Sequence, residues 1–331
     1  MTFIPRSGAE ALMPEEFQRE IVENVPEAST VMTLSTRAPD MSRRQRRIPV
    51  LSVLPMAYFV NPGPAPAPYY GDDDLNFKRT TKALWENKYL DAEELAVIVA
   101  IPEDVLDDSD YDIWAQVKPK LLEAFGLAFD QAVFYGIDAP AIWPDSIYHA
   151  AISTDNFVQI GGSGGDLYDE IMGENGLIAK VEEDGFMVNG HVASMALRGK
   201  LRGLRSPSEK LPLFKSLFKE GMQGSTRYEL DGEPMIFPRN GAVDPSRSML
   251  ISGDWSQLIY AIRKDVTWKI LTEAVIQDPL TNQILYNLPQ MDMVGIRAVM
   301  RLAWQVPNPI NRLQMDEDER YPFAILGTPG S

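Results

Sequence analysis

The segment of this chain that most constrains its fold is residues 109–136, which read SDYDIWAQVKPKLLEAFGLAFDQAVFYG. The pattern predicts one long amphipathic helix. Ser109 and Asp112 form a capping-box pattern at its start, and Gly136 stands where a helix C-cap belongs. Pro119 removes one backbone hydrogen bond and therefore predicts a kink. At about 1.5 Å per residue the helix is roughly 40 Å long, which is enough to brace a whole domain.

Apolar residues recur along this helix at helical spacing. The expected buried stripe consists of Ile113, Val117, Leu121, Phe125 and Ala128, widened on one side by Trp114, Leu122, Phe129 and Val133. Glu123 falls on the opposite, polar face. A stripe of this length needs a sheet to cover it, and residues 293–304 (MVGIRAVMRLAW) supply a strand of alternating character. We expect Phe125 to be buried against the sheet that contains this strand, on which Arg297 and Arg301 point the other way.

Composition excludes several classes of protein. The chain has 331 residues, a formal net charge of −16, no cysteine and two histidines. The absence of cysteine rules out disulfides and thiolate chemistry. The negative charge argues against a surface that binds nucleic acid. No run of eighteen apolar residues occurs, so we expect no membrane span, and the acidic, proline-containing N-terminus does not resemble a signal peptide.

Two apolar segments, 48–60 and 94–101, predict strands on either side of a proline-rich and acidic stretch, 61–76. We therefore expect a two-stranded excursion that projects from the body. Because a two-stranded ribbon is marginal alone in water, its cover should be another subunit. Four basic residues precede the excursion: Arg43, Arg44, Arg46 and Arg47. Pairing with acidic stretches of this or a neighbouring chain is the favoured interpretation of this cluster, and a nucleic-acid contact is the alternative.

The remaining elements are shorter. A helix is expected from Asp166, its cap, to about Val181, followed by a tight turn at Asp184–Gly185 and a second helix with a basic face over 191–204. The residues 249–252, 258–262 and 266–271 read as short strands. A short helix is also expected near residues 14–23.

No pattern predicts a catalytic, cofactor-binding or metal-binding residue. Asp72–Asp74 lack the glycine and glutamate of a calcium loop, and the glycines of 161–166 lack the lysine of a phosphate-binding loop. The adjacent acids Glu93–Glu94 and Asp107–Asp108 are expected to be solvated. His191, near Asp184, is interpreted as a surface or capping histidine rather than a base.

Four segments carry a resemblance to a known family. Residues 80–114 (TTKALWENKYLDAEELAVIVAIPEDVLDDSDYDIW) and 124–136 resemble the tailed-bacteriophage major capsid protein family, and 253–270 and 293–304 are similar to the same family. The resemblance implies the α+β phage major capsid fold, which is shared with encapsulins. It implies an N-terminal arm (1–46), an extended loop (47–101), a peripheral domain (102–149 and 261–331) with the spine helix 109–136, and an axial domain (150–260).

The function implied by the resemblance is structural. Subunits would assemble with one another into hexamers and pentamers of an icosahedral shell enclosing double-stranded DNA, with scaffolding, portal and decoration proteins as further partners. Localisation would be the virion, assembled in the cytoplasm of a host bacterium. The alternative is an encapsulin-like nanocompartment around a cargo enzyme. A soluble enzyme is the remote third option, since no site for chemistry is predicted.

Overall fold

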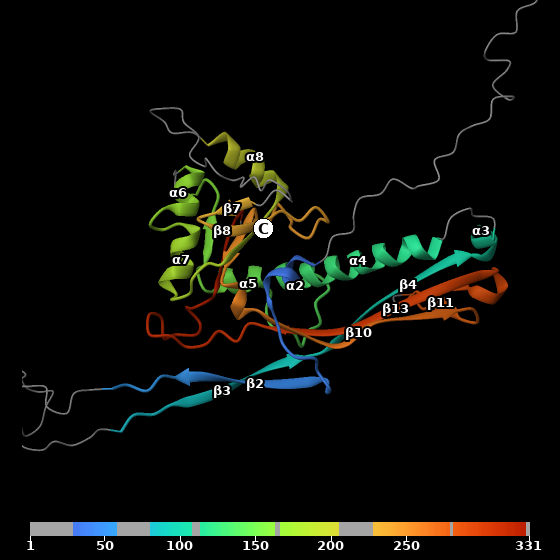
Figure 1. The fold of residues 1–331 in the computed structure, drawn as a ribbon, viewed down its shortest axis with the longest axis horizontal. Coiled ribbons are helices and arrows are strands. Elements are labelled where there is room, and N and C mark those ends of the chain that lie inside the picture. Colours follow the sequence, from blue (N-terminus) through green and yellow to red (C-terminus); the bar gives the residue numbers. More distant parts are fainter. Residues whose placement is uncertain are drawn as a thin grey trace, which may run out of the picture.

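The computed structural model describes residues 29–57, 80–107, 113–162, 166–204, 228–278 and 281–328. Figure 1 shows a compact lobe from which a long helix and a narrow sheet extend on one side, while a two-stranded ribbon projects on the other. The predicted caps Ser109 and Asp112, the tip of the excursion and the short helix near residues 14–23 lie outside the described residues.

The long helix is α4, Ile113–Tyr135, and it continues through Pro119. It ends at Gly136, whose φ of 70° is the left-handed conformation that glycine adopts without strain. Leu121, Phe125, Phe129 and Val133 are buried, which confirms the phase of the predicted stripe. Leu122 was predicted to widen it and is instead 49% exposed, because the sheet covers a narrower arc of the helix than the apolar pattern suggests.

A four-stranded sheet runs beside α4 in the order β1-β10-β13-β4. Its strands are β1 (Thr36–Arg37), β10 (Ile259–Leu271), β13 (Met293–Gln305) and β4 (Glu93–Pro102). The alternation predicted for 293–304 is confirmed in part. Ile296, Ala298 and Met300 are buried and Arg297 is exposed, but Val299 and Ala303, on the face of Arg297, are buried as well. The two strands predicted over 258–271 form one strand, whose pairing with β13 shifts register between Ile262 and Thr267.

The compact lobe holds a six-stranded sheet in the order β5-β14-β9-β6-β8-β7. Its strands are β5 (Phe157–Gln159), β14 (Phe323–Gly327), β9 (Leu250–Gly253), β6 (Gly190–Ala193), β8 (Glu233–Ile236) and β7 (Tyr228–Leu230). The helices of this lobe are α5 (Ile147–Ser153), α6 (Leu167–Met172), α7 (Leu177–Glu183) and α8 (Met195–Gly203). Strand β9, central in this sheet, pairs with both β14 and β6.

Two helix predictions in this lobe are wrong in extent. The helix expected from Asp166 to Val181 is two helices, because α6 ends at Gly173, where an added Cβ would lie 2.4 Å from the carbonyl oxygen of Asp169. Asp166 does cap α6, as predicted. The helix expected over 191–204 begins only at Met195, since the residues before it pair as β6 with β8 and β9.

Shorter elements complete the described chain. They are α2 (Thr30–Leu34), α3 (Glu103–Asp107), the 3-10 turns η2 (Trp255–Gln257) and η3 (Leu288–Gln290), and the hairpin of β11 (Val275–Gln277) and β12 (Ile284–Asn287). No helix among the described residues is long and apolar enough to span a bilayer.

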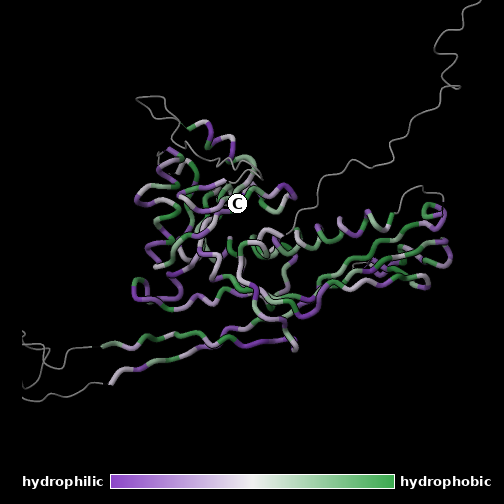
Figure 2. Tube along the Cα trace, in the orientation of Figure 1, coloured by the Kyte–Doolittle hydropathy of each residue, from purple (hydrophilic) through white to green (hydrophobic). Residues whose placement is uncertain are grey.

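The core is continuous between α4 and the lobe. Phe129, Val133 and Phe134 of α4 pack in one cluster with Trp255, Trp304 and Phe323. A second cluster lies between the six-stranded sheet and α6–α8. Figure 2 shows hydrophobic stretches in these elements and also along the projecting ribbon, outside both clusters.

Candidate functional site

The candidate site is the projecting ribbon, made of β2 (Gln45–Val53) and β3 (Leu84–Asp91). The two strands pair antiparallel from Gln45 opposite Asp91 to Val53 opposite Leu84. The expectation that the strand over 94–101 completes the ribbon is wrong: that strand is β4 and pairs with β13. The partner within the ribbon is β3, whose mixed sequence LWENKYLD carries no strong strand pattern and was missed.

The two faces of the ribbon differ in exposure. Val50 and Leu90 are buried, at 8% and 0% exposed, and Val50 lines a small cavity with Pro307 and Arg320. The opposite face leaves Trp85 66% exposed and Tyr89 43% exposed. Side chains of a strand alternate between faces, so one face of the ribbon packs on its own chain while the other is an uncovered apolar surface.

We name the exposed aromatic surface of the ribbon the ribbon face. It consists of Trp85 and Tyr89, which share one face of β3 and are both more than a third exposed, whereas the exposed pair Val53 and Leu84 lies at the end of the ribbon on the other face. Strand register places Arg47 directly opposite Tyr89. Exposed apolar clusters of this kind typically mark interaction sites, and the aromatic residues supply most of the area available for burial.

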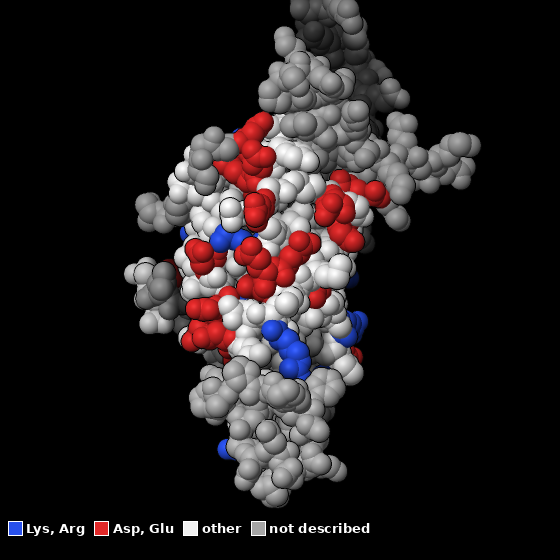
Figure 3. Space-filling model, turned by 90° about the vertical axis from the view of Figure 1, so that its left-hand side faces the viewer, with Lys and Arg blue, Asp and Glu red and all other residues white. Residues whose placement is uncertain are grey.

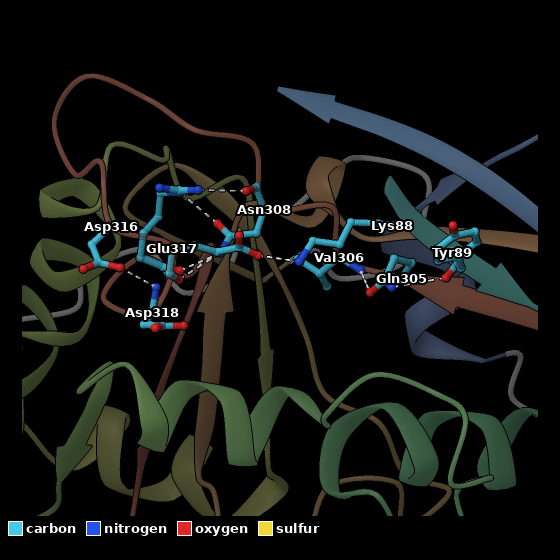
Figure 4. A network of polar contacts seen from close by, with 9 residues as sticks. Lys88, Tyr89, Gln305, Val306, Asn308, Asp316, Glu317 and Asp318 are labelled. Atoms are coloured by element: carbon cyan, nitrogen blue, oxygen red, sulfur yellow. Dashed lines mark hydrogen bonds and ion pairs between the residues drawn. The ribbon is translucent and has the colours of Figure 1, made fainter. Parts of the chain in front are cut away.

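A polar network holds the base of the ribbon against the segment after β13 (Figure 4). The Lys88 ammonium pairs with the Glu317 carboxylate, which joins β3 to that segment. The Gln305 side chain donates to the carbonyl oxygen of Tyr89 at 3.2 Å, and its own oxygen accepts from the Val306 amide at 3.0 Å. These contacts fix the direction in which the ribbon leaves the body.

Arg320 is the buried centre of this base, at 2% exposed. Its Nε donates to Asn308 Oδ1 at 3.1 Å and one terminal nitrogen donates to the Asn308 carbonyl at 3.0 Å. The other terminal nitrogen donates to the Gln314 carbonyl at 3.1 Å. Burial lowers the pKa of the guanidinium, and the nearby carboxylates of Glu317, Asp184 and Asp316 oppose that shift. A buried cation held mainly by neutral acceptors is tolerated only while those acceptors stay in place.

Asn308 supplies two of the acceptors that hold the Arg320 guanidinium, its side-chain oxygen and its carbonyl oxygen. Its φ is 48°, in the left-handed region that asparagine adopts more readily than most residues. Its side-chain amide donates to the Arg320 carbonyl at 2.8 Å while its oxygen accepts from the guanidinium, so the two residues bind each other at both ends.

The predicted basic cluster lies at the start of β2. Arg44 pairs with Glu93 at 2.5 Å, and Arg46 donates to the carbonyl oxygens of Pro39 and Asp40. Arg43 and Arg47 are exposed. The cluster therefore pairs in part within its own chain, which is one of the two protein partners expected for it.

Of the sequence positions weighed for chemistry, those within the described residues form no reactive group of side chains. His191 was expected at the surface, but it is fully buried in β6, where its Nδ1 contacts Ser252 Oγ at 2.7 Å and its Nε2 contacts the Leu230 carbonyl at 3.1 Å. Burial lowers the pKa of His191 to about 4. Among the described residues no cluster of three or more histidines or acids has the geometry of a metal site.

Comparison with known proteins decides what this geometry belongs to. A model of the phage capsid family matches residues 9–313. The chain belongs to the phage capsid family. The capsid subunit is 26% identical over 294 residues to the major capsid protein of Staphylococcus phage 80alpha, a match that covers 88% of this chain and 80% of that protein.

Solved structures agree. A chain from Microbacterium phage Oxtober96 superposes on the capsid subunit with a TM-score of 0.79 at 32% identity, covering 99% of this chain and 100% of that one. A chain from Mycobacterium phage Adephagia gives a TM-score of 0.79 at 26% identity, covering 100% and 99%. The α+β phage major capsid fold implied by the sequence is thus confirmed.

The family assigns the general role of the capsid subunit. It is a structural protein of a phage virion and not an enzyme, and it assembles with other copies of itself into the capsid. The family and the relatives are phage capsids, so the encapsulin alternative is not favoured.

Proposed function

We propose that this subunit forms both the hexamers and the pentamers of an icosahedral shell that encloses the double-stranded DNA of a tailed phage or prophage. The observation that carries the proposal is the ribbon face, which is apolar, projects from the body and has no cover within the described part of the chain. A heterologous contact, in which a ribbon of one copy lies on a different surface of the next, generates closed rings when the rotation allows it.

Within the subunit, we assign each part of the chain to one of the four domains that the family resemblance implies. The arm is residues 1–46 and the extended loop is 47–101. The peripheral domain comprises 102–149 and 261–331, and the axial domain comprises 150–260. The long helix α4 and strands β10 and β13 support this peripheral domain, since they form one elongated body (Figure 1). The compact lobe, which combines residues 150–260 with strand β14 from the C-terminal range, would then pack around the fivefold and sixfold positions.

The relation to DNA is enclosure without sequence-specific binding. The net charge of −16 disfavours attraction to a polyanion. On the end of the molecule that Figure 3 presents, acidic side chains outnumber basic ones. Scaffolding, portal and decoration proteins are further partners of the shell, and assembly takes place in the cytoplasm of the host bacterium.

The test is a pair of matched double variants on the ribbon face. Trp85→Ser with Tyr89→Ser removes the aromatic surface, whereas Trp85→Phe with Tyr89→Phe keeps it apolar. Both side chains are exposed, so neither variant should change the melting temperature of the free subunit by more than a few degrees. The measurement is the fraction of subunit that sediments as shells, with electron micrographs to show fivefold and sixfold capsomers.

We expect the serine variant to remain as free subunits and the phenylalanine variant to form shells. If the serine variant assembles to the same extent as the unchanged chain, the ribbon face is not an assembly surface and the proposal loses the observation that carries it.

A further inference from the structure

The dipeptide Asn-Gly occurs three times in the chain, at positions 175–176, 189–190 and 240–241. In this dipeptide the backbone nitrogen of the glycine can attack the side-chain amide carbon of the asparagine, since glycine has no side chain to hinder the approach. The dipeptide is the same at all three positions. The tertiary structure therefore decides which of them can react in the folded subunit.

At the first position the attacking nitrogen is already bonded. The Gly176 amide donates to the Gly173 carbonyl oxygen at 2.9 Å, which closes the turn before α7. Gly176 is buried, and a Cβ added to it would lie 2.9 Å from the Gly173 nitrogen. The Gly176 nitrogen can therefore attack Asn175 only when this turn opens.

At the second position the asparagine side chain is held by both of its polar atoms. Asn189 Nδ2 donates to Asp254 Oδ1 at 2.8 Å, and Asn189 Oδ1 accepts from the Trp255 amide at 2.8 Å. Gly190 is buried as the first residue of β6, and its carbonyl oxygen accepts from Trp255 Nε1 at 3.0 Å. Turning the Asn189 side chain towards Gly190 would break both of its hydrogen bonds.

The third position lies in the loop between β8 and β9. Gly241 is exposed, and its amide donates to no acceptor in the part of the chain that the structure describes. Its φ is 83°, and no atom lies within 4 Å of the place of an added Cβ. The Ala242 amide donates to Asn240 Oδ1 at 3.0 Å. A bond from the residue two positions ahead folds the side-chain amide back over the peptide that joins Asn240 to Gly241.

We propose that Asn240 is a site of spontaneous deamidation in this subunit. The Gly241 nitrogen loses its proton and bonds to Asn240 Cγ, the bond from Cγ to Nδ2 breaks, and ammonia leaves with that proton. Water then opens the five-membered imide at either of its carbonyls. The product at position 240 is an aspartate or an isoaspartate, and each event adds one negative charge to a chain with a formal net charge of −16.

The isoaspartate product disturbs the core next to it. Isoaspartate lengthens the backbone by one carbon directly before Ala242 and Val243, which are buried in the cluster that contains Phe134 and Tyr135. The following amide, that of Asp244, donates to the Tyr135 hydroxyl at 3.0 Å. A longer backbone displaces these contacts, so conversion should lower the melting temperature of the subunit. Because a virion does not replace its subunits, the product accumulates with the age of the particle.

The test is incubation of the unassembled full-length subunit at mildly alkaline pH, which favours loss of the glycine proton. Digestion and mass spectrometry then follow the three Asn-Gly peptides. Conversion is read from the mass gain of an acid in place of an amide, and from the separation of the aspartate and isoaspartate forms. The same incubation in guanidinium chloride gives the rate at each position in the unfolded chain.

We expect Asn240 to convert at least about tenfold faster than Asn175 and Asn189 in the folded subunit, because the other two react only from locally opened states. In denaturant the three rates should agree within about threefold, because no folded structure distinguishes the positions. Asn240→Gln, whose attack would require a larger ring, should abolish both the product and the fall in melting temperature. Asn175→Gln, the matched change at a protected position, should alter neither.

Conversion of Asn175 or Asn189 as fast as Asn240 in the folded subunit would overturn the proposal. An Asn240 rate that is about tenfold slower in the folded subunit than in denaturant would also overturn it, because the fold would then protect this position as well. An unchanged melting temperature after conversion to isoaspartate would contradict the effect on the core.

Discussion

The base of the ribbon depends on Asn308, and replacing this residue tests how the buried Arg320 is held. Asn308→Ala removes the acceptor of Arg320 Nε and the donor to the Arg320 carbonyl. Both groups belong to a residue that is 2% exposed, so water does not readily replace the lost partner. The variant also places an alanine at a φ of 48°.

The expected cost follows from these contacts. Each buried group left without a partner costs about 1–3 kcal/mol. An alanine in the left-handed region costs about 1–2 kcal/mol more. With two groups left without partners and one strained alanine, we expect Asn308→Ala to lower the free energy of unfolding by about 3–8 kcal/mol. Asn308→Gly loses the same partners without the backbone strain and should cost about 1–2 kcal/mol less.

Asn282 provides a matched control, because it has a φ of 56° but an exposed side chain. Asn282→Ala should cost only the backbone term, about 1–2 kcal/mol, and Asn282→Gly should be nearly neutral. The assay is urea unfolding of the free subunit followed by tryptophan fluorescence. If Asn308→Ala costs no more than Asn282→Ala, the asparagine side chain does not hold Arg320 and the reasoning is refuted.

Three other substitutions test the helix phase and the buried histidine. Phe125→Ala should lower the free energy of unfolding by about 3–5 kcal/mol and reduce the fraction of subunit that sediments as shells from the soluble lysate. Glu123→Ala, on the more exposed side of the helix, should change the free energy of unfolding by no more than about 0.5 kcal/mol. Equal shell fractions for the two variants would contradict the assigned helix phase. Burial keeps His191 neutral, with a pKa of about 4 instead of its ordinary 6.5. The folded state should therefore lose about 3 kcal/mol of stability as the pH falls from 6.5 towards 4. His191→Gln should lack this component in urea unfolding at pH 7.5 and 4.5, and identical pH dependence in both proteins would contradict the assignment.

The sequence by itself determined the elements whose pattern is long and periodic. The buried centre of the α4 stripe, the glycine at its end and the core face of β13 follow from helical and strand spacing, whereas the exposure of Leu122 and the burial of Val299 do not. The family resemblance was likewise readable, because it rests on extended runs of residues. Such patterns depend only on neighbouring residues in the sequence, so they predict a helix or strand without information on which elements pack against it.

The tertiary structure decided which elements meet. Strand β3 carries polar residues and is a strand because it pairs with β2. Strand β4, which the sequence places in the ribbon, pairs with β13 in the four-stranded sheet. His191 is buried because β8 and β9 flank its strand, which no spacing in the sequence indicates. The contact of Asp130 with Ser29 joins residues 101 positions apart. Pairings across such separations depend on how the whole chain closes, and local propensity does not encode them.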